Sequence, residues 1–318
     1  MLSIKRLRAA KALFFLFTLC VCACSDPHAG KTPGKNAKTP APAEDPQPAP
    51  AAQNYRPDAV KIVVSTPPQK YLVQRLAGDH AYVVSLLGEH DDFLKTEHVS
   101  DEKLAELADA KLFFKCGAPV EKSVKVPPTC KTYNMMKDLK LRPFASHTQY
   151  LNGGKSFVND PYIWLAPGKA VKMLPEVYQG LRAVCDERWY GEFTQNFTRF
   201  TRELNSLEGD IQRILLDSLS RDILVAEPVL GYFCDDFGLK QFSYDFTPAN
   251  AADEFMRTTI ENKIRVVLFS PVAPANIDGR TANLLGGTVE TINPMAENYT
   301  ENLLRIASAI AGRRYETQ

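Results

Sequence analysis

The residues of this sequence with the most potential for metal chemistry lie in one polar stretch, Gly88 to Val99. The stretch reads GEHDDFLKTEHV and contains His90, Asp91 and a second histidine, His98. Imidazole nitrogens and carboxylate oxygens are ligands that zinc takes in proteins, and carboxylates also suit manganese. The stretch is therefore a candidate metal-binding loop. The alternative interpretation is a solvated polar loop that binds nothing.

A further candidate ligand is Glu227, which follows the apolar segment Asp222 to Ala226 and precedes Pro228. The segment predicts a buried strand. Its carboxyl end is where ligands of α/β sheets bind, so the carboxylate stands at a favourable place for a site. A lone acid there can instead cap the next helix, and the spacing does not separate the two interpretations.

No enzyme motif is present in the sequence. It contains no glycine-rich phosphate loop, no GxSxG, no HExxH and no CxxC. Its 38 basic and 37 acidic residues nearly cancel, which gives no reason to expect nucleic acid as a partner. We therefore expect a binding protein that is not an enzyme and that has no organic cofactor.

One long helix, from Asp186 to Ser218, would have to position these side chains. Its apolar residues recur at alternating intervals of three and four: Tyr190, Phe193, Phe197, Phe200, Leu204, Leu207, Ile211 and Ile214. That spacing predicts a helix with one apolar stripe, and Asp186 is its expected N-cap. Such a helix would be about 45 Å long. We interpret it as a spine between two lobes, with a coiled-coil segment as the alternative.

Strands and helices alternate on both sides of this helix. The predicted strands span residues 60–66, 81–87, 111–116, 131–136, 222–226, 240–245, 265–269 and 288–292. The predicted helices of the second half span residues 229–237, 251–262, 274–285 and 296–311, and a helix at 168–184 is expected to bend near Pro175. The fold class is therefore α/β, with two parallel-sheet lobes joined by one long spine helix.

The first part of the chain predicts export. Residues 1–24 have a basic start, an apolar run and the sequence VCAC, which resembles a lipobox with Cys24 as the lipidated residue. The alternative is an ordinary signal peptide. Residues 25–57 are rich in proline and alanine, which predicts a disordered tether. The expected lobes are residues 58–185 and 219–318, with the spine at 186–218.

Four cysteines remain in the exported chain: Cys116, Cys130, Cys185 and Cys234. An even number in an oxidising compartment permits two disulfides, with three connectivities. Pairing of Cys116 with Cys130 is preferred because both should lie in the first lobe.

This order of features resembles that of the substrate-binding lipoproteins of zinc and manganese ABC importers. The resemblance covers residues 61–312 and rests on the segments SDEKLAELADAKLFF, DPYIWLAP, EPVLGYFCDDFGL and INPMAENYTENLLRIA. It implies that zinc or manganese is carried as cargo between the lobes and passed to a permease in the membrane. It also implies a monomer at the periplasmic or other extracytoplasmic face, anchored through Cys24.

The resemblance further implies four metal-ligand positions, which fall on Phe93, Tyr162, Glu227 and Asn293. Members of the family usually carry histidine at the first two positions and aspartate at the fourth. Phenylalanine has no lone pair to donate, a neutral tyrosine is a poor zinc ligand, and asparagine offers only a carbonyl. Glu227 is thus the one ordinary ligand in the set.

Three hypotheses follow from this departure. In the first, His90, Asp91 and His147 complete a shifted metal site around Glu227. In the second, Phe93 and Tyr162 beside Glu227 form an aromatic pocket for a small organic cation or a chelated metal. In the third, the cleft is closed and the chain is an envelope interaction protein without a transport role.

Overall fold

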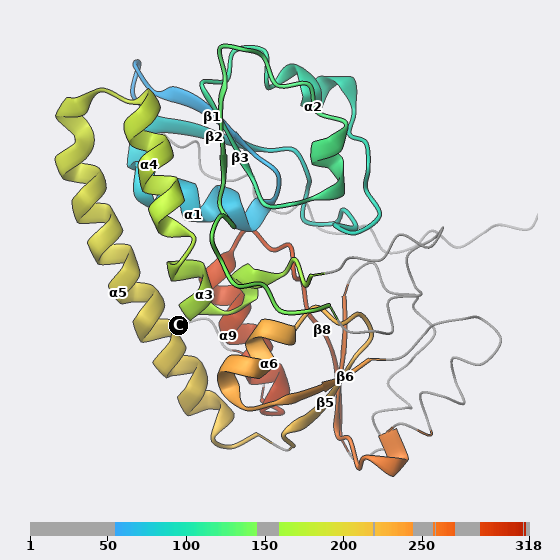
Figure 1. The fold of residues 1–318 in the computed structure, drawn as a ribbon. Helices are drawn as coiled ribbons and strands as arrows, with labels where there is room; N and C mark the ends of the chain where they lie inside the picture. The colour runs from blue at the N-terminus through green and yellow to red at the C-terminus, as the bar shows by residue number, and fades with distance from the viewer. Residues whose placement is uncertain are drawn as a thin grey trace, which may run out of the picture. The chain divides into compact units, whose positions relative to one another are not determined.

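The structure is a computed structural model that describes residues 55–144, 159–218, 220–243, 257, 259–270, 287–313 and 315. Within these residues the chain forms two four-stranded parallel sheets, and one long helix runs alongside both (Figure 1). The predicted fold class is therefore confirmed.

The first sheet has the strand order β2-β1-β3-β4, and all its pairings are parallel. Its elements are β1 (Val60–Val64), α1 (Pro67–Ala77), η1 (Gly78–His80), β2 (Ala81–Ser85), α2 (Asp101–Ala105), β3 (Leu112–Lys115), η2 (Pro119–Lys122) and β4 (Lys131–Asn134). The consecutive residues Ile62, Val63 and Val64 are all fully buried, because apolar side chains pack on both faces of a parallel sheet. Each observed strand is shorter than predicted but begins within one residue of the expected start.

The second sheet repeats this arrangement with the order β6-β5-β7-β8. Its elements are β5 (Asp222–Val225), α6 (Gly231–Phe237), β6 (Lys240–Phe242), β7 (Val266–Phe269), β8 (Thr288–Thr291) and α9 (Tyr299–Ile310). The predicted helix at 274–285 and most of the one at 251–262 lie outside the described residues. In both sheets the strand order reverses between the two central strands. Open α/β sheets bind ligands at such a point, and we call the region beyond the carboxyl ends of β5 and β7 the crevice.

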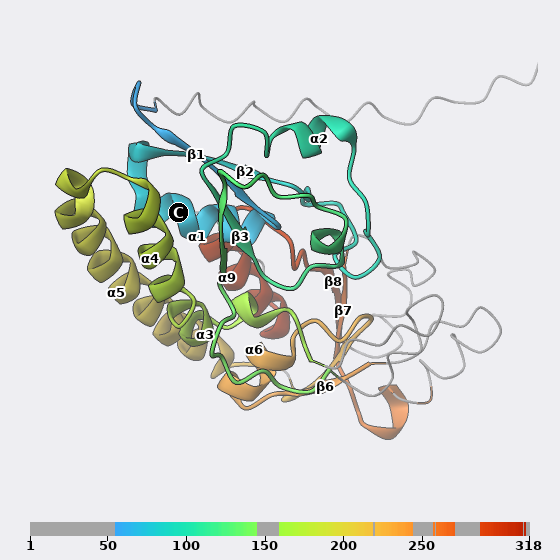
Figure 2. The same ribbon diagram turned by 45° about the horizontal axis from the view of Figure 1, so that its top comes forward.

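The long helix is α5 (Tyr190–Leu215), and the short turn η5 (Glu187–Trp189) leads into it. Asp186 caps this start, since its carboxylate accepts a hydrogen bond from the Arg188 N–H at 3.0 Å. The buried residues of the predicted stripe include Phe193, Phe200, Leu204, Leu207 and Ile211. With them α5 contacts α1, α9, α3 (Pro167–Val171) and α4 (Leu174–Val184), and Figure 2 shows α4 lying along it.

The prediction of one bent helix at 168–184 is wrong, because α3 and α4 are separate helices. Pro175 occupies the first turn of α4, where its missing N–H costs no hydrogen bond. The proline therefore starts a new helix. Before α3, the one-turn helix η4 (Ile163–Leu165) holds the middle of the DPYIWLAP segment.

The Cys116–Cys130 disulfide is not formed, and both cysteines are free in the structure. Cys116 packs in the large core cluster with Phe114, whereas Cys130 packs with Phe113 in a smaller cluster. Side chains of neighbouring strand residues point to opposite faces of a sheet. The two thiols therefore lie on opposite faces of the first sheet. The prediction failed because it took shared membership of a lobe as sufficient for contact.

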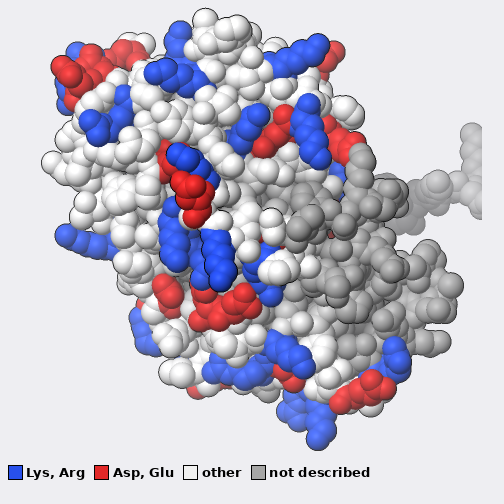
Figure 3. Space-filling view, viewed as in Figure 1, with Lys and Arg blue, Asp and Glu red and all other residues white. Residues whose placement is uncertain are grey.

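Basic and acidic side chains are interspersed over the face of the molecule in Figure 3, in keeping with the net charge of +1. No helix among the described residues combines the length and the apolar character needed to cross a bilayer.

We predict that Leu204→Ala lowers the free energy of unfolding by about 2–5 kcal/mol, because Leu204 is fully buried in the α5 stripe. Leu216→Ala is the matched control. Leu216 follows the same helix and is 71% exposed, so its truncation should cost no more than about 0.5 kcal/mol. Urea denaturation of both variants measures the difference, and equal losses would contradict the packing described for α5.

Candidate functional site

Glu227 and Ser270 follow β5 and β7, the two central strands of the second sheet. The strand order reverses between these strands, and open α/β sheets bind ligands at this switch point, beyond the carboxyl ends of the strands. The Ser270 hydroxyl donates a hydrogen bond of 2.7 Å to Glu227 Oε2. The Glu227 carboxylate is half-buried, and the Ser270 hydroxyl at the end of the adjacent strand holds it at the switch point.

Burial raises the pKa of Glu227, and the charge of Asp92 raises it further, while the Ser270 hydrogen bond and the charge of Lys95 lower it. Lys95 Nζ forms an ion pair with Asp92 Oδ2 at 2.8 Å. Two carboxylates thus act on one another in the crevice, and one ammonium group partly offsets their charge. A place with excess negative charge and restricted water favours a cation.

Three aromatic side chains pack beside this carboxylate. The rings of Phe93, Tyr162 and Trp164 lie with their centroids 5.5–5.6 Å apart in every pair. None is more than 2% exposed. Burial raises the pKa of the Tyr162 hydroxyl well above its usual value, and the charge of Glu227 adds to this shift. Tyr162 is therefore a neutral phenol, and the two positions where the resemblance places histidine ligands are filled by packed rings.

Asp160 fixes the position of Tyr162. Its Oδ1 accepts a hydrogen bond from the Tyr162 backbone N–H at 2.9 Å, and Arg142 Nη1 lies 3.3 Å from its Oδ2. The Tyr232 hydroxyl, on α6, accepts from the Arg142 N–H and donates to the Asp160 carbonyl. Burial raises the pKa of Asp160 to about 7, although the Tyr162 hydrogen bond and Arg142 lower it. This network ties the DPYIWLAP segment to α6.

The side chain of Asn293 is used within its own turn. Its Oδ1 accepts a hydrogen bond from the Met295 N–H at 2.9 Å. Its carbonyl accepts another from Asn302 on α9, at 2.7 Å. The next carbonyl, that of Pro294, accepts from the indole N–H of Trp164. The fourth position implied by the resemblance is therefore used in turn hydrogen bonds, and its neighbour Pro294 contacts the aromatic cluster.

The structure does not assemble the shifted site predicted from the polar loop. His90 and Asp91 are exposed, and Asp91 Oδ2 accepts a hydrogen bond from the Gly88 N–H. No group of three or more close His, Cys, Asp or Glu ligand atoms within the described residues includes Glu227. His147 lies outside those residues, so this ligand set stays a prediction.

Sequence reasoning missed two polar residues of the crevice, Lys95 and Ser270, whereas Asp92 belongs to the loop proposed as metal-binding. Ser270 had a usable signal, because it directly follows the predicted strand 265–269. Lys95 had none, since nothing in a polar loop tells which side chains face inward. His80, which directly precedes β2, is buried and lies close to Asp79 and Glu192.

Comparison with known families adds an independent observation. Residues 62–312 match the family model ZnuA, described as "Zinc-uptake complex component A periplasmic". A "Putative metal-binding protein" of Chlamydia trachomatis serovar D is 25% identical over 258 residues, which cover 79% of this chain and 90% of the relative.

Two further relatives carry zinc in their descriptions. The "Zinc-binding lipoprotein AdcA" of Streptococcus pneumoniae R6 is 24% identical over 258 residues, covering 76% of this chain, which spans about half (51%) of AdcA. A crystal structure of a ZnuA deletion mutant with zinc bound aligns with a TM-score of 0.70 at 24% identity, covering 82% of this chain and 100% of that one. At this identity the structural likeness concerns the fold.

We predict that Asp160→Asn changes how stability depends on pH. The folded pKa of Asp160, about 7, lies above its ordinary value of 3.8. The stabilisation from this carboxyl is therefore complete below about pH 4 and is lost as the pH rises through about 7. Asparagine stays neutral throughout. The free energy of unfolding of the variant, relative to that of the natural chain, should therefore rise by about 4 kcal/mol as the pH increases from below about 4 to above about 7. Urea denaturation at a series of pH values checks this, and parallel profiles would contradict it.

Proposed function

The chain belongs to the ZnuA family of zinc-uptake components, and on this premise we propose that it is the solute-binding protein of an ABC importer for a divalent metal ion. Zinc is the first candidate for the cargo and manganese the second. The metal is carried and released, so no catalytic step is assigned to the chain. The partner is the permease of the importer in the membrane, and the chain acts as a monomer.

The observation that carries this proposal is the half-buried carboxylate of Glu227 at the switch point of the second sheet. Its Oε2 accepts the hydrogen bond from the Ser270 hydroxyl, which fixes the carboxylate beyond the end of β5. The raised pKa of Glu227 reflects a charge that is costly to bury alone, and a bound cation removes that cost.

The remaining ligands in this proposal come from the loop at 88–99 and from His147. Asp92 already acts electrostatically on Glu227. His90 and Asp91 lie on the same exposed loop, so a shift of that loop toward the crevice supplies an imidazole and a second carboxylate. A site with one histidine has lower zinc affinity than one with two or three. We therefore place this chain among the weaker zinc binders of its family.

A second candidate has a specific observation in its favour. The rings of Phe93, Tyr162 and Trp164 form a closed aromatic wall beside one carboxylate. Aromatic faces with a single negative charge attract an organic cation through cation–π contact, and they also accept the apolar ligands of a chelated metal. In this second candidate function, the chain is still the solute-binding protein of an ABC importer, but its ligand is a small organic cation or a metal complex.

The first part of the chain completes the proposal. Residues 1–24 act as a lipoprotein signal peptide, Cys24 carries the lipid, and residues 25–57 form the tether. The lobes then correspond to residues 58–185 and 219–318, with the spine at 186–218. The anchored chain works at the extracytoplasmic face of the membrane.

We predict that the purified full-length chain binds zinc in calorimetric titration and that Glu227→Ala weakens one equivalent by about tenfold or more, because it removes a charged ligand. Glu290→Ala is the control, since Glu290 is an exposed glutamate on β8 of the same sheet. Zinc binding that Glu227→Ala leaves unchanged would rule out the crevice as the metal site. If small organic cations alone raise the melting temperature, the second candidate replaces the first.

We also predict that the double variant Phe93→His/Tyr162→His binds zinc at least about tenfold more tightly than the natural chain. It would restore imidazole nitrogens at the two positions that the resemblance assigns to histidine. Phe93→Leu, which leaves the position apolar, is the control and should not tighten binding. Titration with zinc measures both. Equal affinities in the double variant and the control would mean that positions 93 and 162 do not converge on the Glu227 carboxylate.

A further inference from the structure

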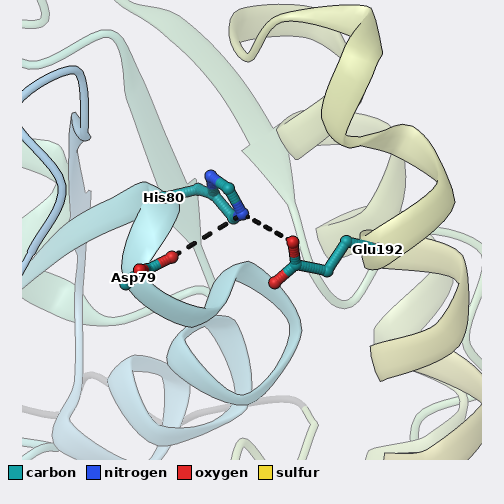
Figure 4. Close-up of side chains that lie close together, drawn as sticks. All are labelled: Asp79, His80 and Glu192. Atoms are coloured by element: carbon teal, nitrogen blue, oxygen red, sulfur yellow. Dashed lines mark hydrogen bonds and ion pairs between the residues drawn. The ribbon is translucent and has the colours of Figure 1, made fainter.

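A second cluster of ligand-type side chains lies away from the loops that surround Glu227. Asp79 and His80 belong to η1, at the end of α1, and Glu192 lies in the first turn of α5. Figure 4 shows both carboxylates directed at the same imidazole nitrogen of His80. Among the described residues, this is the group of three in which every ligand atom lies within 4.8 Å of the others.

The arrangement exceeds what a hydrogen-bonded histidine needs. His80 Nε2 lies 3.0 Å from Glu192 Oε2 and 3.6 Å from Asp79 Oδ1. A ring nitrogen carries at most one hydrogen, so it can donate one good hydrogen bond, and Glu192 accepts that one. The second carboxylate has no comparable reason to approach the same nitrogen. Two acids converging on one nitrogen favour a shared cation.

The spacing of the His80 nitrogen from the two carboxylate oxygens is close to that in zinc coordination. Zinc binds histidine nitrogen and carboxylate oxygen at about 2.0–2.2 Å in tetrahedral geometry, which places neighbouring ligand atoms roughly 3.3–3.5 Å apart. The two measured separations, 3.0 and 3.6 Å, lie on either side of that value. An ion can therefore enter with small movements of two flexible carboxylates and no movement of the imidazole.

Burial differs among the three ligands in a way that suits a metal site. His80 is only 3% exposed, and its ring stacks on Trp189 with centroids 4.3 Å apart. The edge of Phe193 packs against it as well, at 5.6 Å. The side chains of Asp79 and Glu192 are 49% and 45% exposed. The nitrogen ligand is thus held rigidly, while the carboxylates face solvent and leave the ion accessible to water.

Two arginines lie near the cluster, and each pairs with an acid outside it. The guanidinium groups of Arg56 and Arg188 lie over the Trp189 ring. Both pair with Asp58, at 3.6 and 2.8 Å, and Arg188 also pairs with Asp186 at 3.6 Å. Two carboxylates outside the cluster therefore offset the two arginine charges, and the cluster keeps its negative charge for a bound ion.

We propose that Asp79, His80 and Glu192 form a second, peripheral metal site that takes Zn²⁺ with three protein ligands and one water. The three-ligand set with an open position is a zinc pattern, and one nitrogen with two carboxylates suits zinc better than the oxygen-seeking calcium or magnesium. This peripheral site is separate from the crevice at Glu227, and the proposal does not depend on the function proposed for the crevice.

Occupancy of this site would join the first lobe to the spine. His80 precedes β2 of the first sheet, and Glu192 belongs to α5, so one ion links the two elements. The link adds to the hydrogen bond from Asn196 on α5 to the Leu76 carbonyl at the end of α1. Because the ion binds the folded chain alone, zinc should raise the melting temperature, and above the dissociation constant the rise should grow with the logarithm of the zinc concentration.

The test is zinc titration of the purified full-length chain, stripped of metal beforehand, followed by thermal unfolding with and without zinc chloride. Glu192→Gln and Asp79→Asn keep the shape of each side chain and remove its charge. We expect each to weaken one zinc equivalent by about tenfold or more. Glu208→Gln, a half-buried glutamate further along α5, is the matched control and should bind as the natural chain does.

A Glu227→Gln background separates this site from the crevice. In that background zinc should still bind and raise the melting temperature, and addition of Glu192→Gln should abolish both effects. Loss of all zinc binding in Glu227→Gln alone would overturn the peripheral site and leave the crevice as the metal site. Zinc binding that Glu192→Gln and Asp79→Asn both leave unchanged would also overturn it. Binding lost in Glu192→Gln but unaffected by Glu227→Gln would keep the peripheral site and end the crevice proposal.

Discussion

The structure depends first on the buried stripe of α5. A helix of 26 residues presents a face long enough to contact both lobes, and its apolar residues must be covered. Helices α1, α3, α4 and α9 all contact it, and α1 and α4 also contact strands of the first sheet. Ion pairing of Arg75 with Glu203 adds a polar link to α1. Because one rigid element supports both lobes, movement between them should be small.

The crevice follows from that arrangement. Helix α9 rests on α5, and the hydroxyl of Tyr299 at its first turn donates a 2.5 Å hydrogen bond to the Trp164 carbonyl. The indole of Trp164 in turn donates to Pro294. The aromatic cluster is therefore anchored to the same scaffold as the carboxylate it faces. Packed rings stand at the two positions where the resemblance implies histidines, and both parallel sheets are present around them.

This separation of fold from site explains why family membership does not determine the cargo. Glu227 stands at a ligand position that the resemblance implies, and Ser270 donates a hydrogen bond to it from the next strand. The remaining positions supply packing or turn hydrogen bonds. The cluster of Asp79, His80 and Glu192 is the reverse case. It brings three ligand-type side chains together where the sequence shows no ligand motif.

Much of the architecture was predictable because periodicity and strand–helix alternation are local properties of the chain. The sequence by itself determined the α5 stripe, the Asp186 cap, the two parallel sheets and the place of Glu227 after a strand. Two predictions from the sequence failed. Pro175 starts a new helix and does not bend an existing one, and Cys116 and Cys130 lie on opposite faces of the first sheet. Only the tertiary structure decided that Phe93 and Tyr162 pack with Trp164, and that Glu192 meets His80. Phe93 lies 69 and 71 positions from Tyr162 and Trp164, and His80 lies 112 positions from Glu192. No short-range pattern records which distant side chains a fold brings together.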